Sequence, residues 1–414
     1  MIQDANKIIS YAFERVLPEE SVKRALDKYQ IDKDICVISI GKAAWRMAKA
    51  ARDVLGEKIK QGLVITKYGH ILGDINSFKM IESGHPIPDD NSLKAAEMLF
   101  SLIDSLEKDM EVIILLSGGG SALLEMPEKN LTLVDIQSCT DKLLKCGANI
   151  REINTIRKRL SALKGGKLAI KLKDFRIFQV VLSDVVGDDL GIIASGPAYP
   201  DYTNCEEAMN IVRKYNLEFS DQVQECLMVE TPKVISNVET IVTGNVKNLC
   251  LAASQKAREL GYHTYILTTN LDCEAKEAGR MLASIAKSLH EENSLLNFQL
   301  PCAIIAGGET VVQVHGKGKG GRNQELALSA ACEIVDMVDT LLFSVSSDGT
   351  DGPTDAAGGI VTGLTYRKLL ENGLNPLEYL NNNDSYNALY DADGLIITGP
   401  TGTNVNDLSV LLCR

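Results

Sequence analysis

Short, continuous apolar runs alternate along this chain with longer segments whose apolar residues recur at helical spacing. The runs 34–40 (DICVISI) and 111–116 (EVIILL) are typical of strands buried on both faces of a sheet. Residues 8–17 place apolar side chains three or four positions apart, which predicts an amphipathic helix. Thr132, followed by Asp135, predicts the start of a further helix. The alternation is typical of an α/β fold.

The alternation is interrupted between residues 229 and 238, where the sequence lacks periodicity and contains Pro232. A chain of 414 residues is long enough for two or three domains. We therefore predict two three-layer α/β/α domains, 1–235 and 236–414, the first Rossmann-like with a mainly parallel sheet. The apolar runs within 393–412 are close in sequence and should be antiparallel, which predicts a mixed sheet in the second domain. Whether these last strands return to the first domain stays open.

Two predicted strands end in turns suited to anions. The run 111–116 ends in residues 117–121 (SGGGS), where main-chain N–H groups can approach a phosphate because no Cβ intervenes. This turn matches neither the Walker pattern nor the G-x-G-x-x-G spacing of dinucleotide sites. Lys42 follows the run 34–40, at the end of a strand where open α/β sheets hold ligands. A lysine that only extends from a helix end is the alternative.

A third candidate for an anion site lies within residues 307–325 (GGETVVQVHGKGKGGRNQE). Its pattern predicts a strand end, the carboxylate of Glu309, a return strand at 311–314, a glycine-lysine loop at 316–321 and a helix from Arg322. The loop and the N-terminus of the helix together suit an anion. A solvated hairpin without a ligand is the alternative.

Carboxylates follow two further predicted strands. Asp184 and Asp189 lie beside glycines after one strand, and Asp348 and Asp351 follow another. Carboxylate oxygens in this position suit a hard cation such as Mg²⁺. Turns of the Asx type are the alternative interpretation.

Composition and charge exclude several classes of function. The net charge of −12 argues against a nucleic acid or an anionic membrane as the main partner. We find neither a signal-peptide pattern nor an apolar run near the ~20 residues that span a bilayer. Ten cysteines without a C-x-x-C pair predict reduced thiols and a cytoplasmic protein. Five histidines without ligand spacing argue against zinc, and His85 is expected in a turn or core role.

The basic residues of 154–167 are expected to form a solvated face near a helix C-terminus, where the dipole favours cations. The alternative is that one of these basic residues lines a pocket that binds an anion.

Together the glycine-rich and acidic turns predict phosphoryl transfer. Loops at strand ends converge on one edge of a sheet, and two such domains facing each other would form a cleft lined by N–H groups, cations and carboxylates. Phosphoryl transfer needs this positioning and charge, with Mg²⁺ on the polyphosphate. These turns and side chains do not identify the molecule that accepts the phosphoryl group.

The sequence resembles the glycerate 2-kinases that carry a MOFRL domain, over nearly the whole chain. The resemblance rests on IGKAA (40–44), HPIPD (85–89), LLSGGGSALL (115–124), NTIRKRLSALKGGKLA (154–169), LSDVVGDDL (182–190), IASGP (193–197), GGET with GKGKGGRNQELAL (307–328), SDGTDGPTDAAGG (347–359) and GPTGTNVNDL (399–408). It implies phosphorylation of the 2-hydroxyl of D-glycerate by ATP with Mg²⁺, giving 2-phosphoglycerate and ADP.

The resemblance also implies an active site in the cleft between the two domains. The residues that match the family's site are Lys42, Glu309, Arg322, Asp348 and Asn404. The turns that border it, with their neighbours, supply the remaining binding candidates: Ser117, Gly118, Gly119, Gly120, Ser121, Asp189, Ser195, Gly196, Asn323 and Gln324.

Individual roles are our hypothesis. Lys42 and Arg322 would hold phosphate and the glycerate carboxylate. Asp184 or Glu309 would accept or orient the proton of the C2 hydroxyl. Asp348 and Asp351 would hold Mg²⁺.

Two alternatives stay open at this point. A hydroxypyruvate reductase would need a nicotinamide site, for which the turn 117–121 has the wrong spacing. A non-catalytic protein that binds a phosphate ligand would explain the glycine turns but not the clustered carboxylates. Both a monomer and a homodimer are compatible with the sequence.

Overall fold

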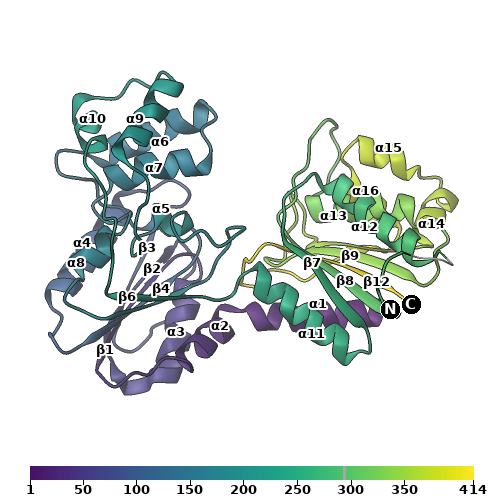
Figure 1. The fold of residues 1–414 in the computed structure, drawn as a ribbon, viewed down its shortest axis with the longest axis horizontal. Helices are drawn as coiled ribbons and strands as arrows, with labels where there is room; N and C mark the ends of the chain where they lie inside the picture. Colours follow the sequence, from purple (N-terminus) through teal and green to yellow (C-terminus); the bar gives the residue numbers. More distant parts are fainter. Residues whose placement is uncertain (292–294) are drawn as a thin grey trace. The chain divides into compact units, whose positions relative to one another are not determined.

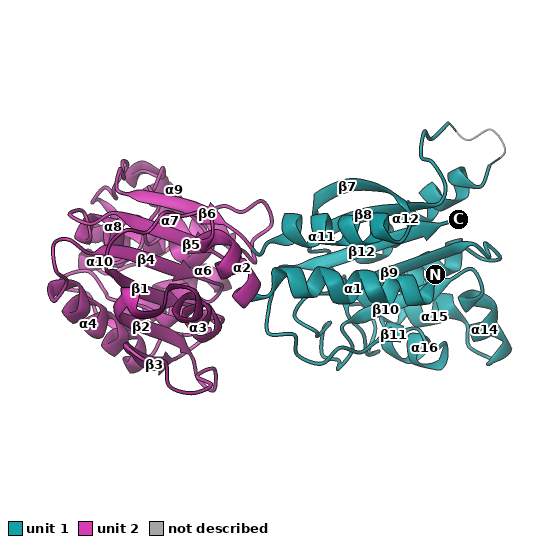
Figure 2. Cartoon of the chain, turned by 90° about the horizontal axis from the view of Figure 1, so that it is seen from below, with its two compact units in different colours: residues 1–17, 244–414 teal, residues 18–243 magenta. Residues whose placement is uncertain are grey.

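The structure, a computed structural model, describes residues 1–291 and 295–414 and divides into two compact units (Figures 1 and 2). Unit 1 contains residues 1–17 and 244–414, and unit 2 contains residues 18–243. These units differ from the predicted division at 235/236. Residues 236–243 extend the first sheet, and the N-terminal helix packs with the C-terminal part of the chain.

The sheet of unit 2 has six strands in the order β3-β2-β1-β4-β5-β6, and every neighbouring pair is parallel. The predicted parallel sheet is therefore confirmed. The strands are β1 (Ile35–Ile40), β2 (Ile59–Lys67), β3 (Phe78–Ser83), β4 (Glu111–Leu116), β5 (Ile177–Val181) and β6 (Val238–Val242). The order reverses between β1 and β4, because the chain first adds strands on one side and then on the other. Open α/β sheets hold ligands at such a switch point, outside the carboxyl ends of the strands.

Helices cover both faces of this sheet. On one face α2 (Pro18–Leu26) and α3 (Ala44–Leu55) share a core with β1 and β4, and on the other α4 (Asp90–Asp104) and α8 (Lys167–Lys171) do so. The four helices α6 (Leu133–Lys145), α7 (Ile150–Leu160), α9 (Cys205–Lys214) and α10 (Asp221–Leu227) form a cluster with a core of its own (Figure 1). The short elements are η1 (Gly56–Lys58), α5 (Gly120–Leu123) and η2 (Ile193–Ser195).

The sheet of unit 1 is mixed, as predicted, with the order β11-β10-β9-β12-β8-β7. Its strands are β7 (His263–Leu271), β8 (Cys302–Gly308), β9 (Thr340–Ser346), β10 (Gly358–Thr362), β11 (Leu395–Ile396) and β12 (Asp407–Cys413). β12 lies between β8 and β9 and is antiparallel to both. The carboxyl ends of β8 and β9 therefore meet the amino end of β12 at one edge of the sheet. The last strand does not return to unit 2.

Unit 1 is also three-layered. The helices α1 (Ile2–Val16) and α11 (Val246–Glu259) cover one face, and α12 (Ala275–Leu289) and α13 (Arg322–Glu333) cover the other. The small helices α14 (Thr365–Glu371), α15 (Pro376–Asn381) and α16 (Ser385–Asp391) pack against α13 (Figure 1).

The return strand predicted at 311–314 does not form. Val311 makes a single β-bridge with Glu274, and residues 312–321 contain no strand. The reason lies in the sheet: β8 already has β12 on one side and β7 on the other, so no edge is left for a hairpin partner.

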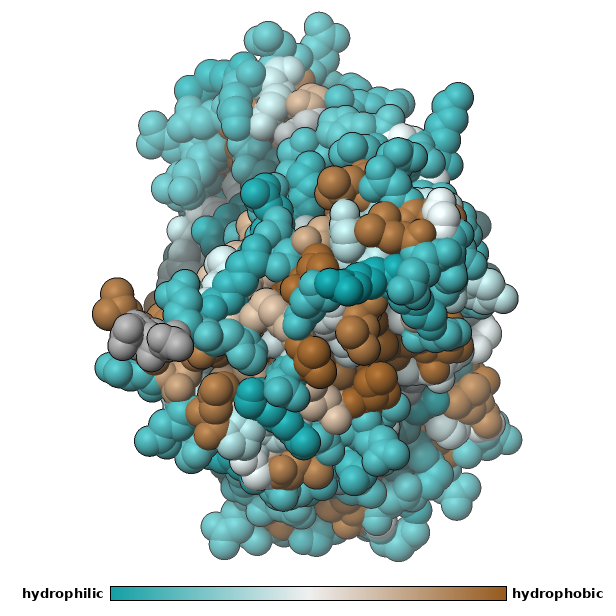
Figure 3. All heavy atoms as spheres, turned by 90° about the vertical axis from the view of Figure 1, so that its right-hand side faces the viewer, coloured by the Kyte–Doolittle hydropathy of each residue, from teal (hydrophilic) through white to brown (hydrophobic). Residues whose placement is uncertain are grey.

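Figure 3 shows one face of the molecule, where hydrophobic residues are scattered among hydrophilic ones and gather near the centre of the view. Exposed apolar side chains of unit 1 include Val338 and Leu364. Among the described residues, no helix is both long enough and apolar enough to cross a membrane.

Candidate functional site

The predicted turns of unit 2 meet at the carboxyl edge of its sheet. The N–H of Lys42, after β1, donates to the carbonyl of Gly118, after β4, at 2.9 Å. The N–H of Ala43 donates to Ser117 Oγ at 3.1 Å. Gly41 has a φ of +125°, and a Cβ there would lie 2.2 Å from Ser117 Oγ, so only glycine allows the two turns to approach this closely. Lys42 and the turn 117–121 thus form one structure at the switch point.

Asp184, which follows β5, belongs to the same group. Its Oδ2 lies 2.0 Å from the point that a Cβ on Gly118 would occupy, so the carboxylate rests against the main chain of the glycine turn. The Lys42 ammonium has no hydrogen-bond or ion-pair partner within the described residues. A cation, main-chain N–H groups and a carboxylate are therefore presented together.

Three other predicted binding residues of unit 2 make hydrogen bonds outside the turn 117–121. Asp189 accepts a hydrogen bond from the N–H of Gly191 at 2.9 Å and lines a pocket of about 210 Å³ between α7 and the segment 199–203. The buried Ser195 hydroxyl donates to Asn154 at 2.6 Å, and the Gly196 carbonyl accepts from a main-chain N–H at 2.8 Å. The contacts of Ser195 and Gly196 hold the loop after β5 in place.

The basic segment 154–167 is not the solvated face that the sequence predicted. Lys158, Arg159 and Lys164 are buried, and each is paired with a carboxylate. Lys164 Nζ lies 2.5 Å from Glu125 Oε2, and burial lowers the pKa of Lys164 to about 8 although Glu125 opposes the shift. Local sequence could not reveal this arrangement, because the partner carboxylates come from distant positions in the chain.

In unit 1, Arg322 occupies the centre of the second group. It is the first residue of α13, and its Nε and Nη2 donate to the two carboxylate oxygens of Asp407 at 2.5 and 3.0 Å. Its Nη1 donates to Glu309 Oε1 at 2.9 Å, and Asn406 Nδ2 donates to Glu309 Oε2 at 3.2 Å. The planar guanidinium is thereby fixed by a bidentate pair and a second carboxylate.

Asp407 is a residue of this group that the sequence did not single out. It is buried at the amino end of β12, and burial raises its pKa to about 6 although hydrogen bonds from Arg322 oppose the shift. Site residues were sought after strands, whereas Asp407 begins one. The signal was present in the run Asn406-Asp407 before an apolar segment, but only the antiparallel orientation of β12 brings it to the site.

The two predicted metal ligands have different surroundings. Asp351 is buried, and its oxygens accept from the main-chain and side-chain N–H groups of Asn323 and Gln324 at 2.9–3.2 Å. This carboxylate caps α13 and has no position left for a cation, and Asn323 and Gln324 are engaged by it. Asp348 Oδ1 accepts from Ser346 and Thr350, while its Oδ2 has no partner within the described ranges.

No cluster of three or more His, Cys, Asp or Glu suited to a metal exists among residues 1–291 and 295–414. Such a cluster is not required for Mg²⁺, which proteins usually bind through one or two carboxylates, substrate phosphates and waters. Asp348 fits that role, and Asp351 does not.

Asn404 lies in an exposed position in the segment between β11 and β12. This segment contacts the loop after β9: the Thr401 N–H donates to the Asp348 carbonyl at 3.3 Å, and the Val405 N–H donates to Ser347 Oγ at 2.8 Å. Asp348 and Asn404 therefore belong to two connected loops at the edge that also holds Arg322.

The glycine-lysine loop 316–321 does not form the predicted anion cradle. The N–H groups of Gly316, Lys317 and Lys319 donate to the side chains of Asn382, Asn383 and Asp384 at 2.8–3.1 Å. A Cβ on Gly316 would lie 2.1 Å from the Asn382 carbonyl oxygen. These glycines permit close packing against the connection between α15 and α16, which occupies the main-chain donors.

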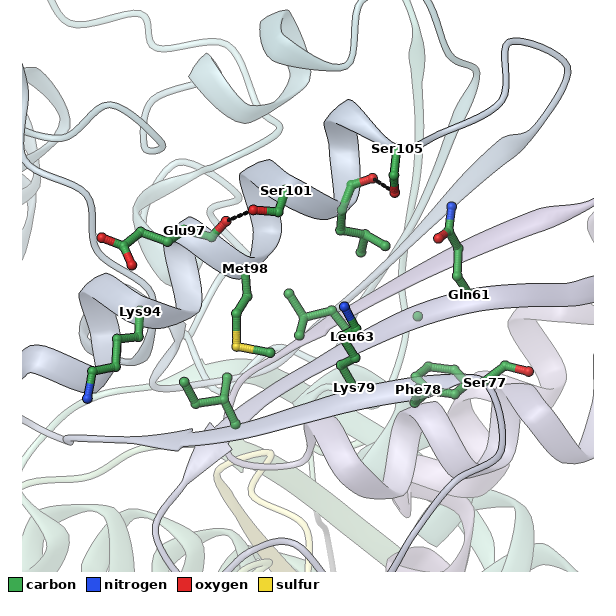
Figure 4. A pocket seen from close by; sticks show the side chains of 13 residues that line it. Gln61, Leu63, Ser77, Phe78, Lys79, Lys94, Glu97, Met98, Ser101 and Ser105 are labelled. Carbon is green, nitrogen blue, oxygen red and sulfur yellow. Dashed lines mark hydrogen bonds between the residues drawn. The ribbon is translucent and has the colours of Figure 1, made fainter.

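A separate pocket of about 830 Å³ lies between α4 and the strands β2 and β3. Figure 4 shows Leu63, Met98 and Phe78 at its wall, with Lys94 and Glu97 extending from α4. It contains none of the predicted site residues, because it lies against the face of the sheet rather than at its carboxyl edge.

Comparison with known proteins finds similar sequences for both units. Residues 4–228 match a family described as a domain of unknown function, DUF4147, and residues 302–407 match the MOFRL family. A D-glycerate 2-kinase of Thermotoga maritima is 50% identical over 406 residues, which cover 98% of this chain and 97% of the relative. A protein of Agrobacterium vitis named putative hydroxypyruvate reductase is 36% identical over 381 residues, covering 91% of this chain and 86% of the relative.

A solved structure has the same fold. The crystal structure of a glycerate kinase from Thermotoga maritima has a TM-score of 0.96 and 49% identity, and the match covers 100% of this chain and 99% of that chain.

Proposed function

The chain belongs to the glycerate kinase family of the DUF4147 and MOFRL type, whose members are kinases that transfer phosphate to an alcohol. From this premise we propose that it phosphorylates the 2-hydroxyl of D-glycerate. The reaction would use ATP and Mg²⁺ and give 2-phosphoglycerate and ADP. The observation that carries the proposal is the 50% identity to a D-glycerate 2-kinase over 98% of the chain. The residues at the two sheet edges support it, since they offer the cations, N–H groups and carboxylates that phosphoryl transfer needs.

In unit 2, the turn 117–121 and Lys42 receive phosphate oxygens. The close approach of the Gly118 main chain to Lys42 and Asp184 supports this role, because an anion placed there meets N–H groups and an ammonium together. Preorganised donors stabilise the charge that develops in the transition state, each by about 3 kcal/mol.

In unit 1, Arg322 binds an oxyanion of the substrates, the glycerate carboxylate or a phosphate. The carboxylates of Asp407 and Glu309 keep its guanidinium in one orientation, so little conformational entropy is lost when the ligand binds. Asp348 offers its Oδ2 to Mg²⁺, and the metal when bound neutralises phosphate charge.

In the transfer itself, the C2 oxygen of glycerate forms a bond to the γ-phosphorus of ATP as the bond to the β-phosphate oxygen breaks. The hydroxyl proton passes to a carboxylate of the site, Asp184 or Glu309, and ADP leaves. The proposal requires the residues of unit 2 and unit 1 to act on the same substrates, which stays a prediction.

The test is product analysis by phosphorus NMR after incubation of the full chain with D-glycerate, ATP and Mg²⁺. We expect the 2-phosphoglycerate signal and ADP release that depends on D-glycerate and on Mg²⁺. A 3-phosphoglycerate signal would contradict the regiochemistry, and ADP release without glycerate would contradict the acceptor.

A hydroxypyruvate reductase is the second candidate, because a relative that is 36% identical carries that name. The G-x-G-x-x-G spacing of a dinucleotide site does occur, at Gly316, Gly318 and Gly321. Its main-chain donors are bound to the Asn382–Asp384 connection, however, and the loop does not directly follow a strand. We expect no loss of NADH absorbance with hydroxypyruvate, and brisk turnover would favour the reductase.

A further inference from the structure

His85 lies at the carboxyl edge of the unit 2 sheet but has no part in the mechanism proposed above. Its segment follows β3, and its ring is directed at the glycine turn after β4. The ring atoms Cδ2 and Nε2 lie 3.0 and 3.2 Å from the point that a Cβ on Gly119 would occupy. Cγ of Lys42 lies 3.2 Å from the same point. The absence of a side chain at Gly119 therefore lets Lys42 and His85 border one turn together.

The segment that carries His85 is fixed on both sides. Asp89 accepts from the N–H groups of Asn91 and Ser92 at the start of α4, and from the Tyr68 hydroxyl, beyond β2, at 2.6 Å. The N–H of Gly84, the residue before His85, also hydrogen-bonds to Asp89. The position of the ring is thus set by the surrounding elements and not by a mobile loop.

The two histidines at this edge have different partners. His70 Nδ1–H donates to the Lys42 carbonyl at 2.9 Å, so this ring holds the main chain of the lysine turn. His85, which is half-buried, has no hydrogen-bond partner in residues 1–291 and 295–414. Neither ring nitrogen is among the fully buried polar atoms that lack a partner, so both reach solvent and can meet a ligand that enters from it.

The electrostatic surroundings keep this ring neutral. Burial, and after it the positive charges of Lys42 and Lys67 together with His70, lower the pKa of His85 to about 4. At neutral pH the ring therefore carries one N–H donor and no charge. The neutral ring offers a hydrogen-bond donor of defined orientation, and Lys42 supplies the positive charge of the site.

We propose that His85 donates a ring N–H to an oxyanion bound between Lys42 and the turn 117–121. The inference rests on the proposed kinase function and deepens it by adding a substrate-binding residue. The oxyanion is a phosphate of the nucleotide or the carboxylate of glycerate, since both present oxygen acceptors of the same kind. The neutral donor selects by geometry, whereas Lys42 attracts any anion.

The first test follows the histidine ring signals of the full chain by proton–carbon NMR at pH 7. The His85 signal is identified by its loss in His85→Gln, and His315, exposed in unit 1, is the internal control. We expect the His85 signal to shift to saturation with inorganic phosphate or with D-glycerate, and the two titrations distinguish the two sources. The His315 signal should not follow. A His85 signal unaffected by both ligands overturns the proposal, whether or not the chain is a glycerate kinase.

The second test compares His85→Gln with His85→Leu in the kinase assay. Gln retains an N–H donor and Leu keeps similar bulk without one, so donation predicts that Leu loses about 10- to 100-fold in kcat/KM, the range for a lost hydrogen bond to a charged group, and that Gln loses less. His315→Gln is the matched control and should leave kcat/KM unchanged. Equal losses in Gln and Leu, or a smaller loss in Leu, would mean that the ring only fills space. An inactive wild type would instead reject the kinase function and leave the NMR result to decide for His85.

Discussion

At the scale of single residues, the two cations proposed for substrate binding are held in opposite ways. The Lys42 ammonium has no protein partner within the described ranges, whereas the Arg322 guanidinium is bonded to two carboxylates. We therefore expect removal of Lys42 to lower activity without lowering stability, whereas removal of Arg322 also leaves the buried Asp407 without its partner. An alanine substitution is therefore informative at Lys42, whereas Arg322 needs a substitution that keeps a positive charge.

For Lys42, we expect Lys42→Ala to lower turnover at least ~100-fold, because a preorganised charge is lost from the transition state. The midpoint of thermal unfolding should stay unchanged. Steady-state ADP release and calorimetry measure the two quantities. Lys49→Ala, which removes an exposed ion pair with Asp53 on α3, is the control and should retain wild-type turnover. A Lys42→Ala enzyme of near wild-type rate would remove Lys42 from the mechanism.

For Arg322, the informative change is Arg322→Lys, which keeps a cation beside Asp407 but loses the bidentate fork. We expect a loss in turnover of about 100-fold, close to that of a lost oxyanion donor. Chemical denaturation should show a smaller loss of unfolding free energy than in Arg322→Ala. Equal stability of the two variants would show that the buried pair does not need a cation.

The aspartates after β9 give a prediction that separates metal binding from capping. We expect Asp348→Asn to raise the Mg²⁺ concentration needed for half-maximal activity without changing stability. Asp351→Asn should instead lower the free energy of unfolding by about 1–2 kcal/mol, because the cap of α13 is weakened. Activity measured against Mg²⁺ and urea denaturation distinguish the two effects. A higher Mg²⁺ requirement in Asp351→Asn, with an unchanged requirement in Asp348→Asn, would identify Asp351 as the metal ligand.

At the scale of elements, the periodicity of the chain predicted most helices and strands, and the helix cap predicted from neighbouring residues forms. Thr132 and Asp135 form a reciprocal capping box at the start of α6, as their spacing predicted. The failures concern segments whose conformation depends on distant partners. The loop 316–321 is bound by residues 382–384, and the basic side chains of α7 and the following turn are neutralised by Asp201 and Glu125.

The buried pair of Lys164 and Glu125 illustrates how such an element is stabilised. We expect Glu125→Gln to lower the free energy of unfolding by about 3 kcal/mol or more, because it leaves a buried charge without its partner. The double variant Glu125→Gln with Lys164→Met should recover part of that loss. Denaturation in urea measures both, and an additive double variant would contradict the coupling.

The same pair predicts a dependence of stability on pH. The pKa of Lys164 is about 8 in the fold, against 10.5 for an ordinary lysine, so between these values the unfolded chain binds more protons. Lys164 therefore contributes a rise in the free energy of unfolding as pH increases from about 8 towards 10.5. As pH falls through that window the free energy of unfolding decreases, because protonation of Lys164 favours the unfolded chain. Lys164→Met should remove this part of the slope in denaturation curves.

At the scale of the whole molecule, the ends of the chain meet in unit 1. Asp4 on α1 accepts hydrogen bonds from the Tyr262 hydroxyl and from Arg414, each at 2.9 Å. Ile8 and Phe13 on α1 share a core with α11 and the sheet of unit 1. Helix α1 thus stabilises a unit from which it is separated by the entire length of unit 2 in sequence.

We expect Ile8→Ala to destabilise unit 1 by about 2–5 kcal/mol, the usual range for a buried side chain truncated to alanine. Hydrogen exchange should accelerate in α11 and β12 but not in β1 and β4. Val22→Ala, on α2 of unit 2, is the matched variant and should give the opposite pattern. Equal acceleration in both units would show that the two fold as one.

The sequence by itself determined the α/β class, the parallel and mixed sheets and the glycine turn 117–121, because periodicity and turn chemistry depend on neighbouring residues. It also singled out Lys42 and Arg322, whose roles stay predictions. Tertiary structure alone decided that Asp407 holds Arg322 and that α1 joins unit 1. It also decided that Asp351 caps a helix and that His85 borders Gly119. Each of these depends on strand order and direction, which bring together residues far apart in the chain, and no local pattern encodes that pairing.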